Sequence, residues 1–178
     1  MIEMDERKPM NVLFVGGANA ARSIMAEAIL HREGKGAFRA FSAGVRPASQ
    51  VHPYAIDLLS RMNFDVRDLR PKSCLSFIEG GEPALDFVFS VCDGATDVLG
   101  SAWPGNPVTG HWALPDPAAA GGNHAEARLA FADVFRMLNN RIAILASLPI
   151  QSLDRRLLNR QLDLIAARKD DLKAPAAA

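Results

Sequence analysis

Hydrophobic and polar positions along this chain follow two different periods. Four short stretches are either continuously apolar or alternate between apolar and polar residues, as expected of strands in a largely buried sheet. These stretches are residues 10–15, 37–43, 85–92 and 108–114. Elsewhere the apolar residues recur every three or four positions, which is typical of helices. The helical stretches are residues 23–33, 52–62, 73–78, 124–148 and 151–172.

Several element boundaries carry local signals. Gly34 and Gly36 end the first helix. Pro53 suits the first turn of the second helix, and Ser73 is a candidate cap for the short third one. Residues 93–106 are punctuated by Gly and Pro, which predicts a loop with room for one helical turn.

Long apolar stripes mark the last two helices. In the first of them the stripe consists of Ala125, Leu129, Ala132, Phe135, Leu138, Ile142 and Leu145. In the second it consists of Leu153, Leu157, Leu158, Leu162 and Ile165. Packing on a sheet explains both stripes. A surface for a partner protein on the last helix is the alternative.

The alternation of strands and helices predicts one α/β domain with three layers. Such βαβ units build a parallel sheet, here of four strands flanked by helices. We expect a flexible lead at residues 1–9, the domain at 10–172 and a frayed tail at 173–178. Ligands of open parallel sheets bind where the strands end. This places residues 16–23, 92–97 and 114–116 on one edge.

Composition narrows the functional classes. The 178 residues carry 20 basic and 20 acidic side chains, so the balanced charge favours neither nucleic acid nor an anionic membrane as partner. No apolar run approaches the roughly 20 residues of a membrane span, and the charged N-terminus lacks the apolar core of a signal peptide. Two cysteines form no disulfide framework. We expect a cytoplasmic monomer or weak dimer.

The stretch that follows the first strand is the main candidate for chemistry. It consists of Gly16, Gly17, Ala18, Asn19, Ala20, Ala21, Arg22 and Ser23. Backbone N–H groups of such a loop, together with the dipole of the following helix, can bind an anion. The planar guanidinium of Arg22 suits a tetrahedral oxyanion. Ser23 could donate to a bound oxygen or cap the helix, and Asn19 tolerates a left-handed backbone.

Other readings of this loop fit less well. A dinucleotide fingerprint needs glycine where Ala18 and Ala21 stand. A mononucleotide loop needs Gly-Lys-Ser or Gly-Lys-Thr, which is absent. A plain turn between strand and helix has no need of the charged Arg22.

The segment resembles the anion loop of the low-molecular-weight tyrosine phosphatases and of the thioredoxin-coupled arsenate reductases. Their loop reads Cys, five residues, Arg, Ser; here Arg22 and Ser23 match, as do Asn19 and Ala26-Glu27. Further matches in the same order are Ser42-Ala43-Gly44, His52-Pro53, Val91-Cys92-Asp93, Trp103-Pro104-Gly105, the stretch 111–118 and the tail 141–164. The resemblance covers nearly the whole chain and favours the reductase branch. It implies the phosphotyrosine phosphatase I-like fold.

The family's nucleophilic cysteine falls on Gly16, and glycine has no atom that could attack phosphorus or arsenic. Gly17 and Ala18 also depart from the usual loop, which favours natural divergence over an engineered change. Of the thiols that the reductase branch uses in relay, the resemblance leaves only Cys92. Cys74 aligns with no family thiol and reads as a small hydrophobe.

Three more assignments follow from the resemblance. Asp116 matches the general acid that protonates a leaving oxygen, although Pro-Asp-Pro is also a turn in its own right. Asn19, Glu27 and Ser42 match residues that hold a potassium ion in some reductases; a buried Glu27 paired by hydrogen bonds alone is the alternative. The four histidines show no metal-ligand spacing. They are His31, His52, His111 and His124.

The function implied is that of a pseudo-enzyme. It would bind phosphate, arsenate or a phosphorylated ligand in the loop 16–23 and would require no cofactor. One alternative is an active reductase or phosphatase that works through Cys92. Another is a partner-binding scaffold on the C-terminal helices.

Overall fold

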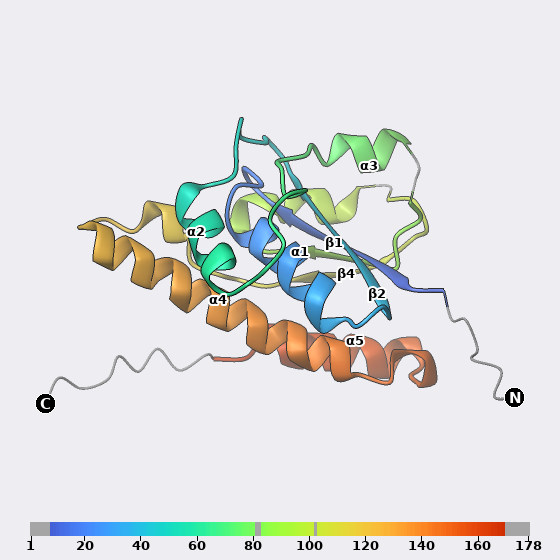
Figure 1. Cartoon of the computed structure of the whole chain (residues 1–178). Coiled ribbons are helices and arrows are strands. Elements are labelled where there is room, and N and C mark those ends of the chain that lie inside the picture. Colours follow the sequence, from blue (N-terminus) through green and yellow to red (C-terminus); the bar gives the residue numbers. More distant parts are fainter. Residues whose placement is uncertain (1–7, 81–82, 102, 170–178) are drawn as a thin grey trace, which may run out of the picture.

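The computed structural model describes residues 8–80, 83–101 and 103–169. Its centre is a sheet of four strands in the order β2-β1-β3-β4, all paired in parallel. The strands are β1 (Met10–Gly16), β2 (Phe38–Gly44), β3 (Phe87–Ser90) and β4 (Val108–His111), as Figure 1 shows in part. The four-stranded parallel sheet predicted from the hydrophobic pattern is confirmed. The predicted flexible lead and frayed tail lie outside the described residues, apart from residues 8 and 9.

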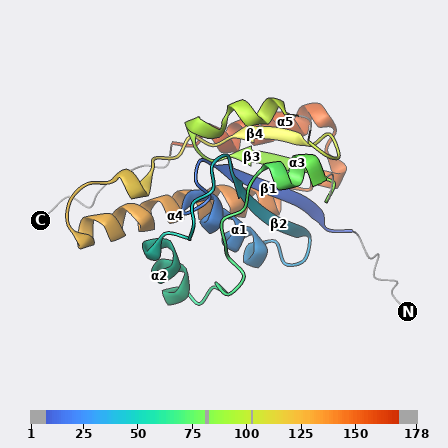
Figure 2. The ribbon, with the colours of Figure 1, turned by 90° about the horizontal axis from the view of Figure 1, so that it is seen from above.

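Helices cover both faces of the sheet (Figure 2). They are α1 (Arg22–Glu33), α2 (Pro53–Arg61), α3 (Leu75–Gly80), α4 (His124–Ser147) and α5 (Arg155–Ala166). One face packs against α1, α4 and α5, with α2 against α4 and α1. The other face packs against α3 and the loop after β3, which forms short 3-10 turns at Asp93–Ala95 and Asp97–Gly100.

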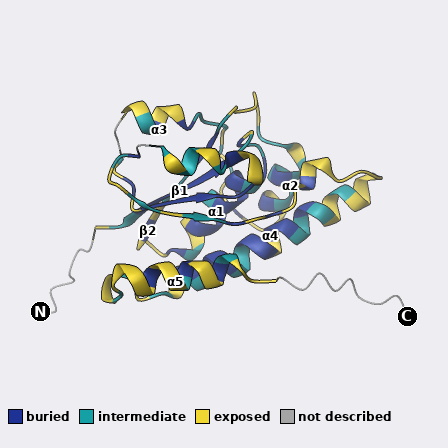
Figure 3. Cartoon of the chain, turned by 180° about the vertical axis from the view of Figure 1, so that it is seen from behind, coloured by how far each residue is buried: buried dark blue, intermediate teal, exposed yellow. Residues whose placement is uncertain are grey.

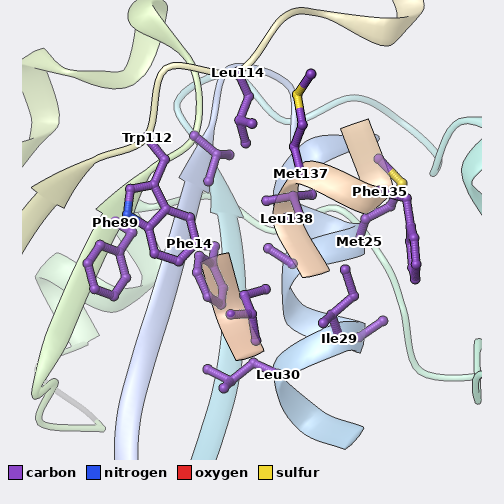
Figure 4. Close-up of a cluster of buried hydrophobic side chains, with 14 of the residues drawn as sticks. Phe14, Met25, Ile29, Leu30, Phe89, Trp112, Leu114, Phe135, Met137 and Leu138 are labelled. Carbon is purple, nitrogen blue, oxygen red and sulfur yellow. The ribbon is translucent and has the colours of Figure 1, made fainter. Parts of the chain in front are cut away.

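A stack of aromatic side chains lies in the core on the α1 face of the sheet. The ring of Trp112 stacks on Phe89 with centroids 4.7 Å apart, and Phe89 stacks on Phe14 at 5.9 Å. Figure 4 shows these rings grouped in one buried cluster that also contains Leu30 of α1 and Leu138 of α4. This packing ties the segment after β4 to the rest of the domain.

The last two strands are shorter than the apolar pattern predicted. The predictions extended to residues 85–92 and 108–114, whereas β3 ends at Ser90 and β4 at His111. Cys92, Trp112 and Leu114 are nevertheless buried. Beyond the strand ends the chain therefore stays in the core without continuing the sheet, so burial there does not report strand structure.

The C-terminal helices also differ from the prediction. The apolar stripe of α4 begins at Phe131, because the first turns extend past the sheet and leave Leu129 61% exposed (Figure 1). The last helix begins only at Arg155, since a 3-10 turn at Ile150–Ser152 follows Pro149. It ends at Ala166, whereas the prediction extended to residue 172. Residues 170–172 of that prediction lie outside the described residues.

The stripe of α5 packs within the domain. Leu158, Leu162 and Ile165 are buried, while Leu157 of the predicted stripe is 45% exposed. Figure 3 shows α5 with both buried and exposed residues along its length. Among the helices of the described residues, none combines the length and the apolar character needed to cross a membrane.

Candidate anion site

The loop between β1 and α1 is held by the segment that follows β2. Its carbonyl oxygens accept backbone hydrogen bonds of 2.8–3.0 Å from that segment. The pairs are Val45 to Gly16, Arg46 to Gly17, Ala48 to Ala18 and His52 to Ala20. Because N–H and C=O of a peptide point in opposite directions, the loop N–H groups face the other way. Within the described parts of the chain, the N–H groups of residues 17–21 donate to no protein acceptor.

Asn19 shapes the loop from inside. Its φ of 50° lies in the left-handed region, which asparagine tolerates as predicted. The side chain is buried: Nδ2 donates to the hydroxyls of Ser23 and Ser42, each at 2.9 Å, and Oδ1 accepts from the Lys72 N–H at 2.7 Å. The loop conformation thus depends on the first turn of α1 and on two distant chain segments, β2 and the connector at Lys72.

Gly44 is needed where β2 passes under the loop. A Cβ there would lie 2.9 Å from both N and Cβ of Asn19 and 3.0 Å from the carbonyl carbon of Ala18. We expect Gly44→Ala to lower the free energy of unfolding by about 1–3 kcal/mol, since backbone atoms must shift. Urea unfolding measures this change. Gly94→Ala is the control, because nothing lies within 4 Å of a Cβ at that position; equal stability of the two variants would contradict the close approach.

Arg22 and Asp116 meet across the site, as predicted from the two strand ends. Arg22, the first residue of α1, donates from Nη1 to the Leu114 carbonyl at 3.0 Å. Its Nη2 lies 3.5 Å from Oδ2 of Asp116. Asp116 also accepts from the Ala118 N–H at 3.1 Å. The Asp116 carboxylate therefore both stabilises its own turn and pairs with Arg22.

A cavity of about 190 Å³ lies over the loop. It is lined by residues 16–23 together with His52, Asp116 and Ala118. The volume admits a tetrahedral oxyanion, and the N-terminus of α1 favours negative charge there. A second cavity of about 340 Å³ shares His52 and Ala118 and adds Tyr54, His124 and Phe131.

His52 lines the site, although the sequence did not predict it as a site residue. Its Nδ1 accepts from the Tyr54 N–H at 3.2 Å, so it caps α2 while lining both cavities. The hydroxyl of Tyr54 is hydrogen-bonded to Nδ1 of His124. The available signal was a histidine directly before a helix-opening proline. At the Ncap position one ring nitrogen can cap the helix while the rest of the ring lines the neighbouring cavity.

Ser23 lies above Gly16. A Cβ on Gly16 would be 2.9 Å from the Ser23 Oγ. The prediction that Ser23 could cap α1 is wrong: the helix begins at Arg22 and its N-cap is Ala21. The Ser23 hydroxyl is buried within the first turn and accepts from Asn19.

The two cysteines have different surroundings. The Cys92 thiol lies beside the loop, 4.0 Å from the position of a Cβ on Gly17, and is 5% exposed. Cys74 packs with Phe77 in the second core, where burial raises the pKa of its thiol. A raised pKa leaves less thiolate, so Cys74 behaves as the small hydrophobe that the sequence suggested.

A serine, a histidine and an aspartate form a second feature missed in the sequence. Ser90 Oγ lies 2.6 Å from Nδ1 of His111, whose Nε2 lies 3.1 Å from Oδ1 of Asp93. Ser90 is fully buried, so its hydroxyl cannot reach a substrate. The three residues link the ends of β3 and β4 to the 3-10 turn that begins at Asp93. In the described part of the chain, no group of three or more His, Cys, Asp or Glu is arranged to hold a metal ion.

Asn19, Glu27 and Ser42, which the resemblance links to potassium, do lie together. The Ser42 hydroxyl donates to Oε2 of Glu27. A fourth residue that the sequence did not single out joins them: Nζ of Lys72 lies 3.1 Å from the same carboxylate oxygen.

Comparison with known proteins identifies the family of this fold. A model of the low molecular weight phosphotyrosine protein phosphatase family matches residues 11–159. An arsenate reductase from Archaeoglobus fulgidus is 24% identical with a TM-score of 0.61, over 77% of this chain and 99% of that one. A low molecular weight protein tyrosine phosphatase from T. tengcongensis is 24% identical with a TM-score of 0.63, over 81% and 99%.

A third structure is described as an arsenate reductase in the phosphate binding state. It is 26% identical with a TM-score of 0.55, over 75% of this chain and 97% of that one. No curated protein is similar enough to match the chain. The family match over most of the sequence, together with the shared fold, shows that this chain belongs to the low-molecular-weight phosphotyrosine protein phosphatase family.

Proposed function

We propose that this chain binds a tetrahedral oxyanion in the loop 16–23 and does not turn it over. The ligand is phosphate, arsenate or the phosphoryl group of a larger molecule. One observation carries the proposal: four carbonyls of a loop that lines the cavity are held by the segment after β2, so the N–H groups of the same peptides point the other way and are available to an anion. Arg22 adds a fixed positive charge at that cavity.

The missing element is an attacking atom. By resemblance the nucleophile belongs at Gly16, which has no side chain. In a serine protease, removal of the nucleophile alone costs about a millionfold in kcat. Binding does not need this group, and a thiolate at Gly16 would repel an incoming anion. The absence of a thiolate at position 16 therefore lowers the rate of turnover but favours binding of the anion in the ground state.

Two further observations support the ligand class. A 26% identical arsenate reductase has been described in a phosphate binding state. The adjoining cavity lined by His52, Tyr54, His124 and Phe131 offers room for the organic part of a phosphorylated ligand. We propose a cytoplasmic setting, in which the free thiols of Cys74 and Cys92 stay reduced.

Calorimetric titration with phosphate, arsenate, sulfate and phenyl phosphate tests the proposal. We expect Arg22→Ala to raise the dissociation constant about 10- to 100-fold, because charge-assisted hydrogen bonds contribute about 1.5–3 kcal/mol. Arg160→Ala is the control: it removes one exposed positive charge from α5, outside the cavity lining.

Asp116→Asn provides an independent check. Its carboxylate lies 3.5 Å from the Arg22 guanidinium and competes with a bound anion for that charge. We expect the amide to bind phosphate a few-fold more tightly. Absence of binding in the wild type at millimolar oxyanion, or an unchanged affinity in Arg22→Ala, would refute the proposed site.

A second candidate function is catalysis through Cys92, favoured by the position of its thiol beside Gly17. The measurement is turnover of arsenate with thioredoxin, or of an aryl phosphate, by the wild type and by Cys92→Ser. Turnover that Cys92→Ser abolishes would establish this function in place of simple binding. Turnover that persists in Cys92→Ser would exclude Cys92 as the reacting group.

A further inference from the structure

A polar cluster lies beside the loop, and apart from Asn19 its residues are outside the lining of the anion cavity. It joins four chain segments: Asn19 from the loop, Glu27 from α1, Ser42 from β2 and Lys72 from the connector between α2 and α3. Asn19 and Ser42 are buried, and the Glu27 and Lys72 side chains are only 17% and 22% exposed. Its contacts are therefore partly shielded from water, so charges there interact more strongly than in bulk solvent.

The ammonium of Lys72 is surrounded by oxygen atoms. Nζ lies 3.1 Å from Oε2 of Glu27, 3.1 Å from the carbonyl oxygen of Arg70 and 3.5 Å from Oγ of Ser42. A carboxylate, a carbonyl and a hydroxyl are the groups that a hard cation takes as ligands. Here the three N–H donors of a lysine take the same set.

The same cluster positions the anion loop. Ser42 accepts from Nδ2 of Asn19, and Oδ1 of Asn19 accepts from the Lys72 backbone N–H. The Lys72 carbonyl in turn accepts from the Gly44 N–H at 2.7 Å. The path from the ammonium to the loop therefore has two steps: Nζ holds Glu27 and Ser42, and Ser42 holds Asn19.

A free potassium ion does not fit this arrangement. Asn19 presents its NH₂ group, not its oxygen, to Ser42, because Oδ1 is turned toward the Lys72 N–H. The Glu27 carboxylate already has the ammonium as its counter-ion. A second cation beside Nζ would meet like charge at short range.

We propose that Lys72 is a tethered cation that takes the place of a free monovalent ion and positions the loop through Ser42 and Asn19. The residue is a positioning residue, since it lies outside the lining of the anion cavity. This inference concerns what holds the loop and is independent of whether the loop binds an oxyanion.

Thermal unfolding of the full chain in potassium chloride and in choline chloride of equal ionic strength tests the proposal. The wild type is expected to have the same Tm in both salts. Lys72→Ala keeps the backbone bonds to Asn19 and Gly44 but removes the ammonium. Its Tm is expected to fall by about 3–10 °C in choline and to rise again in potassium, saturably, because Glu27 and the site line an open cavity of about 540 Å³ that a small ion can enter.

Lys72→Met separates charge from packing. Its uncharged stem fills the space of lysine, so its Tm is expected to be low in both salts with no recovery in potassium. Adding Glu27→Gln to Lys72→Ala is expected to abolish the recovery, since the carboxylate is the charged ligand. Lys8→Ala, an exposed lysine outside the cluster, is the matched control.

Three results would overturn the proposal. The first is a wild-type Tm that is higher in potassium than in choline, because a free ion would then bind beside Lys72. The second is Lys72→Ala with an equally low Tm in both salts, which would reduce Lys72 to a packing role. The third is recovery by potassium in Lys72→Met. The wild-type measurement needs no variant, so the proposal stays testable even where a substitution prevents folding.

Discussion

Gly16→Cys is expected to give this chain phosphatase turnover at least about a thousandfold above that of the wild type. The substitution places a sulfur atom at the end of β1, at the position of the family's nucleophilic cysteine. Loop N–H groups, Arg22 and the N-terminus of α1 would all lower the pKa of a thiol there and favour the reactive thiolate. The loss of a nucleophile costs about a millionfold in a serine protease, so partial recovery is already measurable.

The new side chain has one neighbour to displace. A Cβ on Gly16 would lie 2.9 Å from Oγ of Ser23, which also accepts from Asn19. A hydroxyl is the end of a short, rotatable side chain, so it can move by a few tenths of an ångström. Gly16→Ala is the matched control, because it meets the same contact without supplying sulfur.

Hydrolysis of para-nitrophenyl phosphate is the measurement for this prediction. In the Gly16→Cys background, Asp116→Asn is expected to slow hydrolysis of phenyl phosphate about 10²- to 10⁴-fold, the usual contribution of a general acid. A folded Gly16→Cys variant that binds phosphate yet shows no turnover would mean that the site lacks more than its nucleophile.

Trp112→Ala is expected to lower the free energy of unfolding by about 3–5 kcal/mol, the cost of emptying a large aromatic site in a core. The ring is fully buried and stacks on Phe89 at 4.7 Å, with Phe14 at 5.7 Å (Figure 4). Trp112 also stands two residues before Leu114, whose carbonyl accepts from Arg22. We therefore expect phosphate affinity to fall together with stability.

Trp112→Phe distinguishes packing from polarity. The indole Nε1 is buried and has no hydrogen-bond partner among the described residues. Phenylalanine keeps the stack and removes this unpaired donor, which offsets part of the lost contact area. The expected loss is below about 1.5 kcal/mol. Urea unfolding followed by circular dichroism measures both variants; a loss in Trp112→Ala no larger than in Trp112→Phe would contradict the assignment of Trp112 as a core anchor.

The pattern of residues was sufficient for the layout of this domain. Continuous apolar runs marked the strands, three-to-four spacing marked the helices, and both depend on neighbours within a few positions. The same locality made the loop 16–23 recognisable, since its small residues, Asn19 and Arg22 stand in one short segment. Strand ends were overestimated where Cys92 and Leu114 stay buried outside the sheet, because burial alone does not report backbone pairing.

Contacts between distant segments needed the tertiary structure. Four loop carbonyls accept hydrogen bonds from the N–H groups of residues 45, 46, 48 and 52, which fix the orientation of their peptides. Lys72 reaches Glu27 across 45 positions, and His111 reaches Ser90 across 21. No sequence period encodes such pairs, because parallel strands are joined by long crossovers that bring remote residues to one edge. The short segment 16–23 therefore predicted a candidate anion loop, whereas the fold decided which of its backbone groups are bound by the chain and which cation lies beside it.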